Sequence, residues 1–132
     1  MTPTSTTTRI AKVATVFAPV ADQDRALDFY VGTLGFEKRA DIPYGRGDRW
    51  VEVGPAGGEA TIALVPPMQG QETTRGGTLC SLYTEDIDTD YAALKSKGVD
   101  VDAEVMRMGD PVPPMFFFRD VDGNSLLIVG SN

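Results

Sequence analysis

Histidine is absent from all 132 residues, and cysteine occurs once, at Cys80. Without imidazole there is no Ser-His-Asp or Cys-His nucleophile system, no histidine general base and no histidine ligand for zinc or iron. A lone cysteine cannot form an internal disulfide and offers a metal only one thiolate, so we expect Cys80 to be a small buried hydrophobic residue. The function is therefore expected to work without imidazole chemistry.

Positive charge is scarce as well, with 12 Lys and Arg against 19 Asp and Glu, a net charge of −7. Because phosphate binding depends on clustered basic residues, and those present are scattered, we expect no nucleic acid partner and no anionic membrane partner. No apolar run approaches the roughly 20 residues of a membrane span, and Met1–Arg9 has no apolar stretch typical of a signal peptide. These absences favour a cytoplasmic protein.

The composition, 42% hydrophobic and 23% charged, is that of one ordinary globular domain covering residues 1–132. Two amphipathic helices are predicted within it, each after a strand. Asp22 caps the first, which carries Leu27, Tyr30, Val31 and Leu34 at helical spacing and ends at Gly35; Asp86 caps the second, which ends at Gly98. The two caps lie 64 residues apart, which indicates an internal repeat.

Each half is predicted to run strand, helix, strand, strand, strand. The strands with the clearest patterns are 11–20, 49–53 and 60–65 in the first half and 78–83, 115–119 and 125–129 in the second. Module 1 then covers about 10–66, a Pro- and Gly-rich linker 67–77, and module 2 about 78–130. We expect an α+β fold of two tandem βαβββ modules, whose curved mixed sheet surrounds a cavity.

The motifs resemble those of a known superfamily. Val20–Asp22, Ala26–Tyr30 and Leu34–Phe36 resemble the V-x-D, A-x-x-F-Y and L-G-F motifs of the vicinal oxygen chelate superfamily, which includes glyoxalase I, extradiol dioxygenases and bleomycin-resistance proteins. Asp120–Leu126 resembles its D-P-D-G-N-x-(L/I) turn, with valine in place of proline. The resemblance covers about residues 12–129 and implies the paired-module fold. It also implies a homodimer with crevices between modules of different chains.

The resemblance also locates the four metal ligands of the metal-dependent members. Here those positions are Thr15, Ala63, Leu79 and Leu127. Divalent cations need converging imidazole, carboxylate or thiolate donors, and three of these four side chains have no donor at all. We therefore expect no metal and no cofactor, and we expect the ligand positions to form part of a cavity wall.

Strand alternation extends this predicted wall, because every second residue of a strand faces the same side. The full set of predicted ligand-binding residues is Thr15, Phe17, Trp50, Glu52, Ala63, Leu79, Tyr83, Met106, Met115, Phe117 and Leu127. Alternatives remain for the large side chains: Trp50 could pack in the core or at a dimer contact, and Met115–Phe118 could all be core. The resemblance assigns Phe116 and Phe118 to the core and Phe117 to the cavity.

These features favour a metal-independent protein that sequesters a hydrophobic or planar natural product, similar to the bleomycin-resistance branch. Its partner would be an aromatic or hydrophobic small molecule, and a cationic one would suit the acidic chain. One alternative is a glyoxalase-like lyase or isomerase with an atypical metal site, or with Glu52, Glu104 or Tyr83 as acid-base groups and a raised carboxylate pKa. A third alternative is an interaction module that keeps only the fold.

Overall fold

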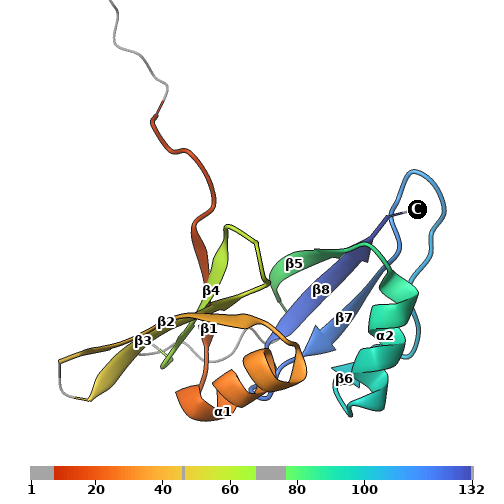
Figure 1. Cartoon of the computed structure of the whole chain (residues 1–132). Helices are drawn as coiled ribbons and strands as arrows, with labels where there is room; N and C mark the ends of the chain where they lie inside the picture. Colours follow the sequence, from red (N-terminus) through yellow and green to blue (C-terminus); the bar gives the residue numbers. More distant parts are fainter. Residues whose placement is uncertain (1–7, 46, 68–76, 132) are drawn as a thin grey trace, which may run out of the picture.

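The chain forms two modules with the same order of elements, as the computed structural model shows for residues 8–45, 47–67 and 77–131 (Figure 1). The first contains β1 (Thr15–Pro19), α1 (Gln23–Leu27), η1 (Asp28–Thr33), β2 (Glu37–Tyr44), β3 (Asp48–Gly54) and β4 (Thr61–Val65). The second contains β5 (Thr78–Thr84), α2 (Ile87–Ser96), β6 (Asp100–Val101), β7 (Met115–Arg119) and β8 (Ser125–Gly130). Most of the predicted linker lies outside the described residues.

Each module has its own four-stranded mixed sheet, ordered β1-β4-β3-β2 and β5-β8-β7-β6. In both sheets the first two strands in this order are parallel and the remaining neighbours are antiparallel. This arrangement confirms the predicted α+β fold of two βαβββ modules. No helix among the described residues is long and apolar enough to cross a membrane.

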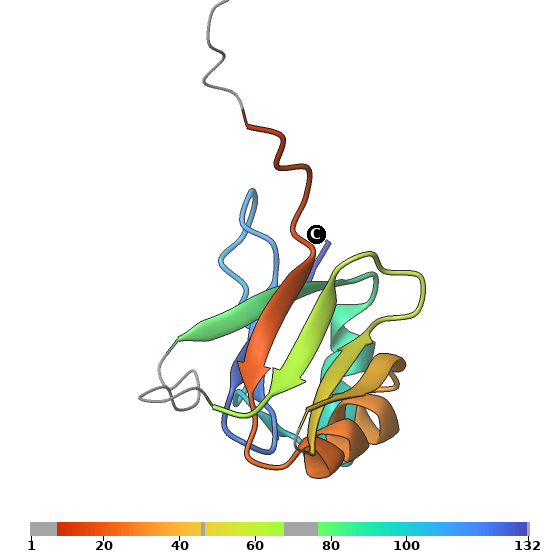
Figure 2. The same cartoon turned by 90° about the vertical axis from the view of Figure 1, so that its left-hand side faces the viewer.

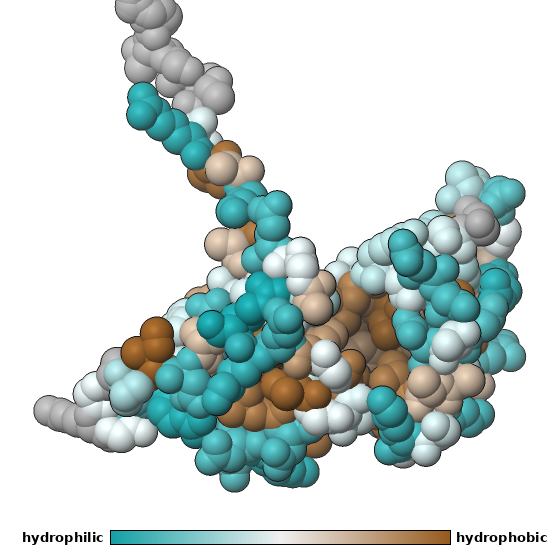
Figure 3. Space-filling view, viewed as in Figure 1, coloured by the Kyte–Doolittle hydropathy of each residue, from teal (hydrophilic) through white to brown (hydrophobic). Residues whose placement is uncertain are grey.

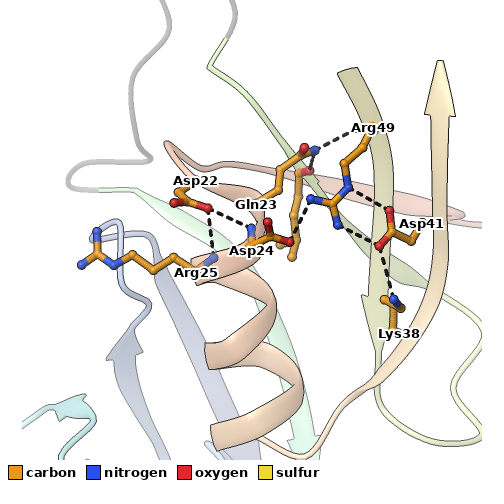
Figure 4. Close-up of polar contacts among 8 residues, drawn as sticks. Asp22, Gln23, Asp24, Arg25, Lys38, Asp41 and Arg49 are labelled. Carbon is orange, nitrogen blue, oxygen red and sulfur yellow. Dashed lines mark hydrogen bonds and ion pairs between the residues drawn. The ribbon is translucent and has the colours of Figure 1, made fainter. Parts of the chain in front are cut away.

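The first helix begins at the predicted cap. The Asp22 carboxylate accepts hydrogen bonds from the backbone N–H groups of Asp24 and Arg25 at 3.0 and 3.1 Å (Figure 4). The next side chain, Gln23, donates from Nε2 to the carbonyl oxygens of Arg49 and Leu64, both at 2.8 Å. The cap therefore starts the helix, and Gln23 fixes that start to the ends of β3 and β4.

Arg49 ties the same helix start to β2. Its guanidinium donates to Asp41 through Nε and Nη2, at 3.0 and 2.8 Å, and to Asp24 through Nη1 at 2.9 Å (Figure 4). Lys38 adds a third cationic contact on Asp41 at 3.2 Å. The hydrogen bond from Arg49 is the main cause that lowers the pKa of Asp41 to about 2, so this carboxylate stays charged over the physiological range.

The first helix continues as a π-helical segment, η1, which the sequence pattern did not predict. The Leu34 N–H bonds to the carbonyl of Phe29 at 3.0 Å, five residues back. The wider turn lets the adjacent residues Phe29 and Tyr30 both enter the core, and it leaves Val31 36% exposed. The predicted placement of Val31 on the apolar face is therefore wrong, because the predicted spacing assumed a regular α-helix throughout.

The two modules share one hydrophobic core through their helix-bearing faces. Phe116 and Phe118 are fully buried, as the resemblance implied, and the rings of Phe118 and Phe29 lie 6.3 Å apart across the modules. Cys80 is partly buried against the same core, where burial raises the pKa of its thiol. Because the helix-bearing faces meet, the opposite, open faces of the sheets point away from the core. Figure 2 shows no helix in front of β1 and β4.

A buried hydrogen-bond cluster also joins the modules. The Tyr30 hydroxyl of η1 donates to Asp120, in the β7–β8 turn, at 2.7 Å. Asn124 donates from its side chain to Asp120 at 3.0 Å and to the Pro19 carbonyl of the first module at 2.9 Å. Burial, and then the Asp120 carboxylate, raise the pKa of Tyr30, so its hydroxyl remains protonated and serves as the donor.

Close packing of α2 on β8 leads to a prediction for Gly130. A Cβ added at this position would lie 2.9 Å from Cβ of Ile87, closer than side chains pack. We expect Gly130→Ala to lower the free energy of unfolding by about 1–3 kcal/mol, measured by urea denaturation. Gly32→Ala is the matched control, because a Cβ there meets nothing within 4 Å. An equal loss of stability in both variants would contradict the prediction.

Candidate ligand-binding face

Five of the predicted wall residues come together on the open face of the first sheet. Phe17 on β1 is paired with Ala63 on β4, and Ala63 is paired with Glu52 on β3, so the three form one row across the sheet. Thr15 and Trp50 lie two residues away along their strands, on the same face. The alternating residues, such as Val51 and Leu64, are buried beneath the helix side. We call this surface face 1.

The polar groups of face 1 form a hydrogen-bonded chain that ends on Glu52. The Thr15 and Thr61 hydroxyls lie 3.1 Å apart, and Thr61 donates to Oε1 of Glu52 at 2.6 Å. The indole Nε1 of Trp50 donates to Oε2 of Glu52 at 2.5 Å, and the ring contacts Phe17 edge-on with centroids 5.7 Å apart. The hydrogen bond from Thr61, followed by that from Trp50, lowers the pKa of Glu52.

The open face of the second sheet, face 2, carries the apolar part of the predicted wall. Phe117 on β7 is paired with Leu127 on β8, and both are partly exposed. Along the same face lie Met115, with Met106 bridged to it, and Tyr83, which is 69% exposed at the sheet edge. This face has aromatic and thioether groups and lacks a counterpart of Glu52 among these residues.

Leu79 differs from the other predicted wall residues. The pairing of β5 with β8 is irregular between Thr78 and Ser81, which breaks the simple alternation of faces. Leu79 is partly buried and packs against the core cluster. The sequence cannot locate such an irregularity, because it depends on how the neighbouring strand pairs.

The four positions that hold metal in the metal-dependent members do not fit a cation here. Thr15 contributes one hydroxyl, which bonds to Thr61, and Ala63, Leu79 and Leu127 contribute hydrocarbon. Within residues 8–45, 47–67 and 77–131, no three Cys, Asp or Glu side chains gather where they could hold a metal ion. The donor set therefore supports no step that passes through a metal.

A separate hollow lies between the modules on their helix side. It has a volume of about 220 Å³ and is lined by residues that include Leu34, Phe36, Leu82, Leu94 and Lys97. Figure 3 shows apolar side chains, in brown, gathered in a hollow between the modules. Of the predicted wall residues only Tyr83 reaches this pocket. The sequence pattern does not predict this pocket, because its lining comes from separate elements whose packing the pattern does not encode.

Comparisons with known proteins agree with the fold. The family model of the Glyoxalase/Bleomycin resistance protein/Dioxygenase superfamily matches residues 10–128, and the chain belongs to this superfamily. YetH of Bacillus subtilis is 33% identical over 123 residues, covering 90% of this chain and 98% of that protein.

Two solved structures are similar over nearly the whole chain. TnmS3, an antibiotic binding protein from a Streptomyces species, superimposes with a TM-score of 0.81 at 34% identity, covering 96% of this chain and all 100% of that one. A superfamily member from Sphaerobacter thermophilus gives a TM-score of 0.83 at 37% identity, covering 92% and 98%. Small-molecule binding is thus represented among the chains that this one is similar to.

Proposed function

We propose that the chain is a metal-independent binding protein of the cytoplasm that sequesters a hydrophobic or planar natural product, in the manner of an antibiotic-resistance protein. The observation that carries the proposal is the pair of open faces, where aromatic and apolar side chains lie exposed and three of the four metal positions hold hydrocarbon side chains. Exposed apolar groups gathered on one surface mark an interaction site. The similarity to TnmS3, an antibiotic binding protein, supports the same class of ligand.

The proposal includes a homodimer. Within one chain the helix-bearing faces meet, so face 1 and face 2 point away from each other and do not enclose a ligand together. Phe17 on face 1 is 50% exposed and Tyr83 on face 2 is 69% exposed, which leaves apolar surface that a second copy would cover. Setting face 1 of one chain against face 2 of another would create two equivalent crevices.

The alternative, a glyoxalase-like lyase or isomerase, needs a group that exchanges protons near neutral pH. The sequence suggested a carboxylate with a raised pKa in an apolar cavity, and for Glu52 this expectation is wrong, because two donors lower its pKa. Glu104 is exposed and lies outside both faces as defined here. These observations favour binding over acid-base catalysis.

Tryptophan fluorescence tests the proposal, since Trp50 is the only tryptophan of the chain. Titration with planar natural products, including enediyne and bleomycin-class antibiotics, is expected to quench it in a saturable way. Measured by calorimetry, Phe117→Ala is expected to weaken binding of the best ligand by about tenfold, or about 1.4 kcal/mol, because the contact with the ring is lost. Trp50→Phe is expected to weaken it less, because a ring remains.

Val31→Ala is the matched control, because Val31 is an exposed apolar residue on η1, away from both faces. Unchanged affinity in Trp50→Phe and Phe117→Ala, with the ligand still bound, would show that the binding site lies elsewhere. Elemental analysis of protein purified without chelator addresses the alternative function. Stoichiometric zinc, nickel, manganese or iron would favour the enzyme.

A further inference from the structure

The carboxylate of Glu52 accepts from Trp50 on its own strand β3 and from Thr61 on β4, and the direction of the hydrogen bonds can be deduced. A threonine hydroxyl has one proton, and that of Thr61 goes to Oε1 of Glu52 at 2.6 Å. In the 3.1 Å contact between Thr15 and Thr61, Thr15 must therefore be the donor. The hydroxyl proton of Thr15 points to Thr61, and the hydroxyl proton of Thr61 and the indole N–H of Trp50 both point to the Glu52 carboxylate.

The Glu52 carboxylate can accept further hydrogen bonds. Each oxygen takes one hydrogen bond from the described residues, while an ionised carboxylate has about four lone-pair sites. Glu52 forms no ion pair with any residue in the part of the chain that the structure describes. Arg39, the cation that most affects it, bonds instead to Glu37 at 3.2 Å and to the Pro55 carbonyl. A fixed negative charge therefore remains open to a donor from outside the chain.

The side chains around Glu52 favour a planar donor group on the ligand. Ala63, with its single methyl group, separates Phe17 from Glu52 in the same row. Ala63 is fully buried, and the rings of Phe17 and Trp50 contact each other edge-on, with centroids 5.7 Å apart. Trp50 and Phe17 therefore present aromatic rings beside the Glu52 carboxylate, and such rings favour both planar and cationic groups.

We propose that face 1 binds the cationic or N–H donor edge of a planar aromatic ligand through Glu52, beside Trp50 and Phe17. This inference rests on the proposed binding function and names the chemical class of its ligand. In the proposed dimer, face 2 of the second copy, with Phe117, Leu127 and Met115, contacts the apolar side of the same molecule. The ligand is thus oriented, with its charged edge on one wall and its hydrocarbon on the other.

Three probes with one ring system and different charge test the proposal at pH 8: 9-aminoacridine as the cation, acridine as the neutral form and acridine-9-carboxylate as the anion. Calorimetry on the full chain is expected to give the order cation, neutral, anion, with about a tenfold preference for the cation over acridine. In Glu52→Gln this preference is expected to fall to about one, while acridine binds within about twofold of wild type. Added salt is expected to weaken binding of the cationic probe alone.

Glu59→Gln is the matched control, because it removes the same charge from an exposed carboxylate that pairs with Lys12. The cation preference is expected to survive in it, which separates a local contact from the attraction of the acidic chain as a whole. Equal binding of cation and acridine by wild type, or a preference kept in Glu52→Gln, would overturn the inference and leave the binding function standing. Failure of all three probes to bind would count against both.

Discussion

Replacing Asp120 with alanine is expected to lower the free energy of unfolding by about 3 kcal/mol. Its carboxylate accepts from the Tyr30 hydroxyl at 2.7 Å, from the Asn124 side chain at 3.0 Å and from two backbone N–H groups at 2.9 Å. Tyr30 and Asn124 are fully buried, so water cannot replace the lost acceptor without opening the contact between the modules. Urea denaturation followed by far-ultraviolet circular dichroism measures the loss.

Two matched variants separate this effect from a general disturbance of the turn. Tyr30→Phe removes one hydrogen bond and keeps the ring, so we expect a loss of about 1–2 kcal/mol. Asp122→Ala changes a partly exposed carboxylate of the same turn, which accepts from the Ala21 N–H at 3.0 Å, and we expect a loss of about 1 kcal/mol or less. An Asp120→Ala variant as stable as Asp122→Ala would contradict the proposed importance of the buried cluster.

The elements that local chemistry specifies could be predicted from the sequence. The strand 115–119 is observed as β7 with the same ends, and Asp22 and Asp86 cap the two helices as expected. The first strand was expected from residue 11, but β1 begins at Thr15, where its pairing with β4 begins. The π-helical segment also escaped prediction, because it depends on what Phe29 and Tyr30 pack against.

For the candidate site, the sequence predicted which side chains share a strand face but not their long-range contacts. Alternation along single strands placed Trp50 and Glu52 on one face and separated Phe117 from Phe116 and Phe118, since a period of two needs no partner. The hydrogen bonds between Thr15 and Thr61 and between Tyr30 and Asp120 join elements far apart in the chain. The last pair is separated by 90 residues, and periodicity carries no information about such contacts.

Mixing two binding-deficient variants is expected to restore tight binding sites. Phe17→Ala damages face 1 and Phe117→Ala damages face 2, and both keep Trp50 as the fluorescent reporter. We expect each variant alone to bind about tenfold more weakly than wild type. After unfolding and refolding of an equal mixture, about half of the dimers contain one chain of each kind. If each crevice is made by face 1 of one chain and face 2 of the other, every mixed dimer has one crevice that carries both substitutions. Its second crevice carries neither.

About one crevice in four of the mixture should therefore bind with wild-type affinity, which a fluorescence titration reports as a separate tight phase. The same result is impossible if each site is built within one chain, because every site then carries one damaged wall. Absence of the tight phase, or a monomer in analytical ultracentrifugation at the titration concentration, would contradict the intermolecular crevice. The expected arrangement follows from the shared core: because the helix-bearing faces of one chain meet, face 1 and face 2 point apart, and in the proposed dimer each is completed by a second copy.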